Sequence, residues 1–349
     1  MIKYNIPCIG QGCCVEQLIY HNLEKHRILY DCGSDNLEIL KSYINTLDTG
    51  VSTTLVISHL HRDHINGIPY LLKHFKKQNK KIKSIFLPAY YPELFNIFAI
   101  SIIATKTKET TADIRALIDF IVNLENEENN NISEIIHVTP NEENNSINGK
   151  SIIHTKPQKI TEINDNTYLA MKFWVDLNIF SMLSPTERET LKSIKPDKFI
   201  KKKKEARKIY DDIVKGKNFN MTSMLMATYL YYPDDLKTIM CIGLPEYRSI
   251  LNFFNNGFIC TGDYPLKHSK KNIGIEIQKH FSAEDIQIHQ MMVPHHGSGN
   301  EYCEYIPFNF IEKAYAQNGL KNEYGHPGNN VIEFLEDLGI EFINRQNTF

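Results

Sequence analysis

The sequence predicts a globular protein of the α/β class. Its 349 residues, 42% of them hydrophobic and 23% charged, can bury a large core, which excludes the fibrous and disordered classes. Short apolar runs typical of buried strands alternate with segments whose apolar residues recur at helical spacing. A histidine-rich loop directly follows one of these apolar runs. We predict a single domain over residues 1–349, with a surface insertion at 181–217.

The first ninety residues predict a strand-rich start. Strand-like segments at Val15–Tyr20 and Arg27–Asp31 indicate an opening β-hairpin. Thr54–Ser58 is a short buried strand, and the helix expected at Gly67–Lys77 follows the histidine-rich loop after it. Ser84–Leu87 is a further short strand that ends at a proline.

The middle of the chain contains the clearest helix and two polar segments. Thr111–Leu124 places its apolar residues on one face, and Thr110 with Asp113 supplies a capping signal. Residues 125–149 are rich in Asn and Glu and predict a solvated loop with one short strand. Residues 181–217 interrupt the α/β alternation, and we expect a helical insertion there.

Strands return after residue 219. The expected strands are Ser223–Tyr231, Phe258–Cys260, Ile286–Val293 and Glu341–Asn344, and the expected helices are 246–254, 272–281 and Asn330–Leu338.

Composition also limits the compartment and the partners. No apolar run approaches the roughly 20 residues of a membrane helix, and the first residues lack the pattern of a signal peptide. Seven scattered cysteines without a C-x-x-C pair indicate reduced thiols. We therefore expect a cytoplasmic protein without a membrane partner. Because 39 basic residues face 41 acidic ones, a nucleic acid would have to be held by a local basic patch.

The loop at residues 58–67 carries the clearest chemical signal. It presents His59, His61, Asp63 and His64 within six positions, directly after a buried strand. Alternate positions His59 and His61 can aim at one cation, while Asp63 and His64 aim at a second one nearby. Imidazole and carboxylate ligands suit zinc, manganese or iron.

This H-x-H-x-D-H pattern resembles the metal-binding motif of the metallo-β-lactamase superfamily. Asp31 matches the family's structural Asp that supports the histidine loop, and Thr261-Gly262-Asp263 matches the turn whose carboxylate bridges two metals. The resemblance implies a four-layered αββα sandwich with a metal cleft at one edge between the sheets. It also implies two divalent metal ions, Zn²⁺ or Mn²⁺, with these expected ligands: His59, His61, Asp63, His64, Asp263, His296 and His326.

Further motifs resemble a narrower group, the metallo-hydrolase domain of the competence protein ComEC and its stand-alone relatives. The motifs are Ile9–Gly12, Asn220–Ser223, Val293–Ser298 and Asn322–Pro327. The resemblance implies a phosphodiesterase or nuclease, without the membrane channel of ComEC. Stand-alone members are often found in phage-defence loci, which would imply a regulatory protein partner.

The resemblance leaves three histidines to complete the second metal site: His295, His296 and His326. One of the first two is expected at a metal or the scissile phosphate, and His326 across the cleft as ligand or phosphate contact. Asp63 and Asp263 complete the expected catalytic set with His295 and His296. Ser298 and Asn322 are expected to contact substrate. A further superfamily ligand midway along the chain could be His137 or His154, although each also fits an ordinary surface or strand-end histidine.

The lysine run Lys201–Lys204 has two interpretations. Lys202 and Lys203 could hold phosphates of a substrate strand beside the cleft. Alternatively the run is a solvated helix face, since Glu205, Asp211 and Asp212 follow closely.

Three functions remain open at this point. The first is a nuclease that cuts DNA or RNA phosphodiesters with a metal-bound hydroxide. The second is a hydrolase of a small substrate, such as a cyclic nucleotide, another phosphodiester, a lactone or a thioester. The third is a non-catalytic partner-binding subunit with a decayed site.

Overall fold

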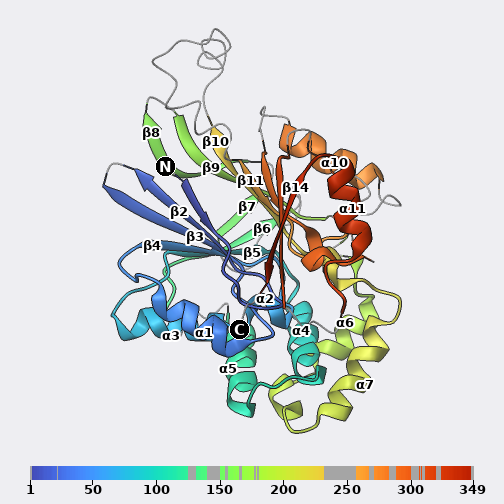
Figure 1. The fold of residues 1–349 in the computed structure, drawn as a ribbon. Helices are drawn as coiled ribbons and strands as arrows, with labels where there is room; N and C mark the ends of the chain where they lie inside the picture. Colours follow the sequence, from blue (N-terminus) through green and yellow to red (C-terminus); the bar gives the residue numbers. More distant parts are fainter. Residues whose placement is uncertain are drawn as a thin grey trace, which may run out of the picture.

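The computed structural model has four layers, with two sheets packed face to face and helices on both outer sides (Figure 1). This is the predicted αββα sandwich of the metallo-β-lactamase fold. The structure describes residues 2–21, 23–124, 131–139, 150–153, 156–164, 167–176, 178, 181–231, 257–266, 271–282, 288–299, 306, 308, 311–319 and 324–346.

The first sheet is formed by the N-terminal half of the chain. In spatial order its strands are β1 (Ile2–Asn5), β2 (Val15–His21), β3 (Glu24–Tyr30), β4 (Ser52–Val56), β5 (Ser84–Pro88), β6 (Ile135–Thr139) and β7 (Lys150–Ile153). The first three strands pair antiparallel, and the pairs from β3 to β7 are parallel. The predicted opening hairpin is therefore confirmed as β2 and β3.

The second sheet repeats this plan with the C-terminal half. In chain order its strands are β8 (Gln158–Asn164), β9 (Thr167–Trp174), β10 (Leu225–Tyr231), β11 (Phe258–Cys260), β12 (Gln290–Met292), β13 (Lys313–Asn318) and β14 (Glu341–Gln346). Strands β8 to β11 pair antiparallel, and β11 to β14 pair parallel. Loops that leave the carboxyl ends of parallel strands lie along one edge of a sheet, which is where α/β proteins bind ligands.

Helices cover the outer faces of both sheets. The first sheet is covered by α1 (Leu37–Thr46), α3 (Ile68–Lys77) and α5 (Thr111–Val122), and the second by α10 (Lys271–Ser282) and α11 (Asn329–Asp337) (Figure 1). The capping box predicted for α5 is present, because Thr110 and Asp113 bond each other's backbone N–H groups.

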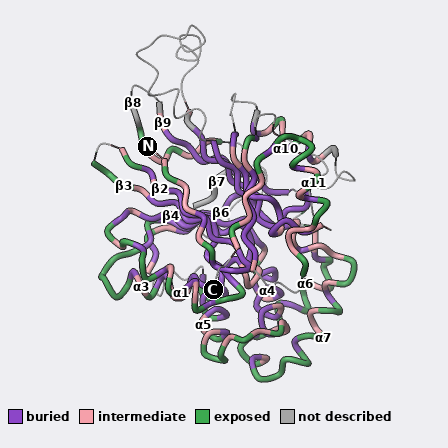
Figure 2. The backbone as a smooth tube through the Cα atoms, in the orientation of Figure 1, coloured by how far each residue is buried: buried purple, intermediate pink, exposed green. Residues whose placement is uncertain are grey.

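Between the sheets, aromatic side chains from both halves of the chain pack directly on each other. Tyr4 of β1 stacks on Phe258 of β11 with ring centroids 4.8 Å apart, and Phe86 of β5 stacks on Phe173 of β9 at 5.1 Å. Figure 2 shows the buried residues concentrated along the strands of both sheets. These contacts join the two halves into one core.

The predicted insertion is helical and is packed onto the rest of the chain. It contains α6 (Pro185–Lys192), a short 3-10 helix (Pro196–Phe199) and α7 (Lys203–Val214), all in contact with helix α4 (Pro92–Ala104). Leu191, Ile200 and Ala206 bury their side chains in the main core. The face of the insertion that carries these three residues is buried, and only its other face is exposed to solvent.

The sequence patterns did not predict several helices and strands of the structure. Helix α4 was missed because apolar residues surround it on every side, so that it has no amphipathic periodicity. Helix α1 and strands β1, β8, β9 and β13 were also missed. The helix expected at 246–254 and most of the polar loop at 125–149 lie outside the described residues.

Two further expectations concern membranes and cysteines. Within the described residues, no helix is long and apolar enough to cross a membrane. Five cysteines are free thiols, and four of these are buried, namely Cys13, Cys14, Cys32 and Cys260. Cys241 and Cys303 lie outside the described residues.

The buried His137 of β6 makes the stability of this fold sensitive to acid. Neither of its ring nitrogens has a hydrogen-bond partner among the described residues. Burial lowers the pKa of His137 from 6.5 to about 4. Between these two values the unfolded chain binds a proton here that the folded chain does not. The free energy of unfolding therefore falls as the pH drops through this window, by about 3 kcal/mol.

We predict that His137→Leu removes most of this acid-dependent loss. Urea unfolding of both proteins at pH 7 and pH 4 gives the comparison, because contributions of all other groups cancel between wild type and variant. An equal loss in both proteins would contradict the prediction.

Candidate metal centre

The histidine loop lies between β4 and α3 and contains the single helical turn α2 (Arg62–Ile65). Backbone hydrogen bonds fix it to the neighbouring hairpin: the N–H of Cys13 donates to the carbonyl of Asp63 (3.1 Å), and the N–H of Cys32 to that of His64 (2.8 Å). A side chain at Gly33 would lie 2.3 Å from the Asp63 backbone. Glycine is therefore needed for the two segments to approach each other.

Asp31 orients this loop from behind. Its carboxylate accepts hydrogen bonds from the backbone N–H and the hydroxyl of Ser58, both at 2.7 Å. The same carboxylate lies 2.7 Å from Nδ1 of His64. The other ring nitrogen of His64, Nε2, lies on the side of Asp263. Such a partner fixes the ring orientation and tautomer of a ligating histidine. These are the contacts expected of the supporting Asp.

A first group of convergent ligand atoms is formed by His59, His61 and Asp263. Nε2 of His59 lies 2.9 Å from Nδ1 of His61 and 3.6 Å from Oδ2 of Asp263. His59 is completely buried. Burial and the neighbouring imidazoles of His64 and His61 hold the pKa of His59 well below its usual range, so its ring is neutral and can bind a metal ion.

A second group is formed by Asp63, His64 and His296. Nε2 of His296 lies 3.3 Å from Oδ2 of Asp63, and Nε2 of His64 lies 3.0 Å from Oδ1 of Asp263. Neither atom of the last pair has a well-aligned hydrogen-bond partner within the described residues, although both are buried. The two oxygens of Asp263 therefore face different groups, as expected of a bridging carboxylate.

The charges around these carboxylates favour their ionised forms. Burial alone would raise the pKa of Asp263, but the electrostatic attraction of the nearby His64 and His295 rings holds it well below its usual range. For Asp63 the hydrogen bond from His296 and the charges of His64 and His296 likewise outweigh burial, so that its pKa is lowered. Both carboxylates are therefore negatively charged at neutral pH.

A third group, Cys13 with Asp31 and His64, has the spacing of a metal site but a different role. Burial raises the pKa of the Cys13 thiol to about 12, so the thiol is protonated at neutral pH. The Asp31 oxygens are already bonded to Ser58 and His64. This group supports the loop from the core side.

The turn that carries Asp263 is held against the histidine loop. Gly262 has a φ of +55°, and a side chain there would lie 2.9 Å from the Cβ of Ser58. The N–H of Asp263 donates to the hydroxyl of Ser223 (3.2 Å), and the N–H of Met224 donates to the carbonyl of Ser58 (2.9 Å). The motif at residues 220–223 thus joins the two loops.

The two histidines after β12 adopt an uncommon backbone. His295 and His296 have φ values of +49° and +56°, and Gly297 follows at +80°. Left-handed conformation at two consecutive non-glycine residues is costly and concentrates at functional sites. It separates the two rings. His296 joins the second group, while Nε2 of His295 lies 3.8 Å from Oδ2 of Asp263 at the edge of the cleft.

The other predicted site residues lie farther out. The ring of His326 is centred 5.6 Å from that of His295, and His326 belongs to none of the three groups, so its role as a ligand or phosphate contact stays a prediction. Ser298 is buried, and its N–H donates to the carbonyl of His295. His137 is also outside the groups, while Asn322 and His154 are not among the described residues.

The lysines of the insertion do not join the cleft. Lys202 pairs with Glu205 of the same helix at 3.1 Å, and Lys203 is the first residue of α7. No hydrogen bond or ion pair of the described residues links either lysine to the ligand groups. Of the two interpretations, a solvated helix face fits these lysines better than a site that holds the phosphates of a substrate strand.

Sequence patterns missed residues that reach the loop from distant segments. Glu109 accepts hydrogen bonds from Arg62 (2.9 Å) and Asn66 (2.6 Å). Asn318 donates to the carbonyl of His296 at 3.1 Å. No local motif surrounds Glu109 or Asn318, so only the fold reveals these supports.

Comparison with known proteins adds one family name. The family model described as "Anti-Pycsar protein Apyc1" matches residues 13–171, somewhat under half of the chain. The matched segment contains the histidine loop and ends before Asp263. This family differs in name from the ComEC-type group, which therefore stays a prediction.

Among solved structures, the crystal structure of the metallo-β-lactamase fold protein YhfI from Bacillus subtilis is similar over 98% of this chain and 94% of its own, with a TM-score of 0.40 and 9% sequence identity. No curated protein matches the chain. The two ligand groups form a candidate two-metal centre in a four-layered αββα sandwich.

We predict that metal binding depends on Asp263 and, less strongly, on Asp31. Wild-type protein should bind two Mn²⁺ or Zn²⁺ ions per chain, and Asp263→Ala should lose at least one, because the first group loses its only carboxylate and His64 of the second group loses its charged neighbour. Asp31→Asn should keep the fold and weaken metal affinity by about 10- to 100-fold. Isothermal titration of the metal-free proteins measures both effects. The surface variant Asp211→Ala is the control, and wild-type stoichiometry in Asp263→Ala would refute the assignment.

Proposed function

We propose that the protein is a metal-dependent phosphodiesterase that hydrolyses a cyclic nucleotide. The observation that carries the proposal is the pair of adjacent ligand groups, in which Asp263 belongs to the first group and lies 3.0 Å from His64 of the second. The match to the anti-Pycsar family supports the substrate class, because that family suggests hydrolysis of cyclic nucleotides. A small cyclic substrate was the second of the functions left open by the sequence.

The residues present fit divalent cations. His59 and His61 with one oxygen of Asp263 would hold the first ion, and Asp63, His64 and His296 with the other oxygen would hold the second. Nitrogen and carboxylate oxygen donors of this kind suit Zn²⁺ or Mn²⁺. When bound, two such ions acidify water and neutralise charge on a phosphoryl group.

The outer histidines are suited to proton transfer and phosphate contact. In hydrolysis of a cyclic phosphodiester, a water oxygen forms a new bond to phosphorus, the P–O bond to one sugar oxygen breaks, and that oxygen takes up a proton. His295 lies at the edge of the cleft, within 3.8 Å of Asp263, where its ring can donate that proton. Burial and the neighbouring His295 lower the pKa of His326 to about 4, so its neutral ring offers a hydrogen bond without a charge.

An exposed tyrosine adjoins these histidines. Tyr324 has 72% of its surface exposed, and its ring stacks on His326 with centroids 5.8 Å apart and an angle of 17°. Most of the Tyr324 side chain is therefore accessible to a flat partner. Because nucleobases of every kind stack on aromatic rings, Tyr324 is suited to hold the base of a nucleotide.

A nuclease remains the alternative, since the same centre would cleave the phosphodiesters of a polymer. To separate the two, protein loaded with Mn²⁺ or Zn²⁺ is incubated with 3′,5′-cyclic mononucleotides, cyclic dinucleotides, and single- and double-stranded DNA and RNA. We expect cyclic nucleotides to be opened and polymers to stay intact. Polymer cleavage lost in Asp263→Ala would establish the nuclease instead. If no phosphodiester is cut although two ions are bound, the proposal is wrong.

Two variants test which residues act in turnover. Asp263→Ala and His61→Ala should abolish hydrolysis with the fold intact, because each removes a ligand of the first group. Asp211→Ala, which removes an exposed carboxylate of α7, should hydrolyse at the wild-type rate. Unchanged turnover in either ligand variant would contradict the assignment.

We predict that Tyr324→Ala raises KM for the cyclic nucleotide by about tenfold, the effect of losing one base-stacking contact. The value of kcat should change far less, since the ring lies outside the ligand groups. Tyr324→Phe keeps the ring face and should retain the wild-type KM. Steady-state kinetics of the three proteins measures this, and an unchanged KM in Tyr324→Ala would exclude base stacking at this position.

A further inference from the structure

A second region of this molecule collects positive charge away from the metal centre. Residues 67–83, which include all of α3, contain six lysines and no acidic residue, although the whole chain has a net charge of −2. All six lysines are exposed, namely Lys73, Lys76, Lys77, Lys80, Lys81 and Lys83. Within the described residues, none of them forms an ion pair. This surface therefore has a strong local positive potential.

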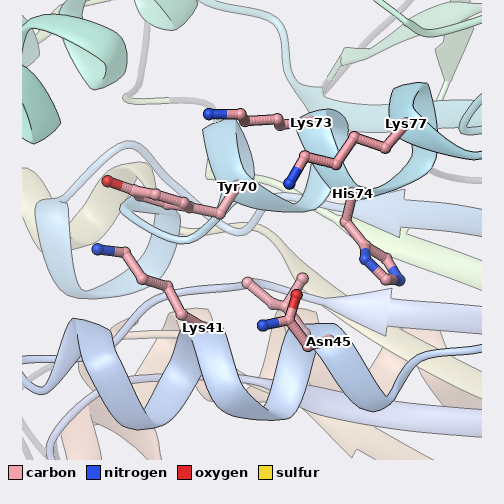
Figure 3. A pocket seen from close by; sticks show the side chains of 7 residues that line it. Lys41, Asn45, Tyr70, Lys73, His74 and Lys77 are labelled. Carbon is pink, nitrogen blue, oxygen red and sulfur yellow. The ribbon is translucent and has the colours of Figure 1, made fainter.

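Part of this surface is hollowed into a groove between α1 and α3 (Figure 3). The groove encloses a cavity of about 180 Å³. Helix α1 contributes Lys41, Ile44 and Asn45, and helix α3 contributes Tyr70, Lys73, His74 and Lys77. The lining holds three ammonium groups, one amide, one phenol and one imidazole, but no carboxylate. Its chemistry is that of an anion site.

The two walls of the groove differ in how their charges are used. On α1, the ammonium of Lys41 lies 2.7 Å from Glu38, 3.8 Å from Asp113 and 4.2 Å from the centre of the Tyr70 ring, so it is largely neutralised. On α3, Lys73 and Lys77 lie one helical turn apart with no acidic partner among the described residues. These two lysines supply the uncompensated charge of the groove.

The lysines of α7 provide an internal contrast. Lys202, the residue before that helix, pairs with Glu205 at 3.1 Å, and Arg207 within it pairs with Asp211 at 2.9 Å. Such pairs cancel charge within the helix. The run of four lysines in the insertion is thus easier to see in the sequence. The positive charge of α3, however, is less neutralised by acidic residues.

We infer that the groove between α1 and α3 binds the phosphate backbone of a single-stranded nucleic acid. The row of lysines continues beyond the groove to Lys83, so it is longer than one phosphate group requires. Backbone phosphates spaced along a strand match such a row, and each neutralised phosphate adds to affinity through counterion release. A membrane surface is disfavoured, because no large exposed hydrophobic side chain lies on α1 or α3 to anchor in lipid.

The test uses the metal-loaded full chain and a fluorescent 20-nucleotide strand with phosphorothioate linkages, which resist cleavage. Fluorescence anisotropy gives the dissociation constant between 50 and 200 mM salt for wild type and for the double variant Lys73→Gln/Lys77→Gln. Lys204→Gln/Lys208→Gln removes the same charge from exposed positions of α7 and is the matched control. Vesicles containing phosphatidylserine form a separate arm.

We expect the groove variant to lower the slope of log affinity against log salt by about 1.4, the value for two lost phosphate contacts on a single strand. The affinity difference from wild type should then shrink about sevenfold between 50 and 200 mM salt. The α7 control should keep the wild-type slope. Hydrolysis of the small substrate should persist in the groove variant, so that this inference and the proposed function fail separately.

Four results would overturn the inference. The wild-type protein could fail to bind the strand, or the groove variant could keep the full salt slope. An equal loss in the α7 control would show that binding follows total charge rather than the groove. Binding of phosphatidylserine vesicles without binding of the strand would assign the surface to membranes instead.

Discussion

The candidate centre depends on one buried carboxylate between two sets of imidazoles. Asp263 faces His59 and His61 with one oxygen and His64 with the other. A buried charge is costly unless neighbouring groups compensate it, and these imidazoles do so only if they stay converged. Hydrogen bonds keep these side chains close together, and they are made by Asp31, Ser58 and Ser223. The same contacts explain why the surrounding loops are so closely packed.

The architecture brings these side chains together because both sheets have the same plan. The histidine loop leaves β4 in the first sheet, while the Asp263 turn and the His296 turn leave β11 and β12 in the second. Stacked pairs such as Tyr4 with Phe258 fix the sheets against each other. The left-handed backbone of His295 and His296 is tolerated because hydrogen bonds from neighbouring segments hold it on both sides.

The local charge of a surface region depends on whether its lysines have acidic partners, and not on the overall composition of the chain. Glu205 and Asp211 of α7 pair with Lys202 and Arg207, whereas the lysines of α3 have no acidic partner among the described residues. A chain with almost no net charge can therefore present one strongly positive face. The candidate metal centre and this face belong to neighbouring segments, since α3 begins four residues after His64.

The sequence by itself determined the loop His59–His64, the supporting Asp31 and the Asp263 turn, because ligand spacing is local and each segment directly follows a strand. It also determined the start of α5, since a capping box is a local pattern. Only the tertiary structure brought His296 beside Asp63 and His64, left His295 and His326 outside the ligand groups, and revealed Glu109 and Asn318. Those outcomes depend on contacts between segments far apart in the chain. Helix α4 belongs with them, because a helix buried on all sides has no periodicity to read.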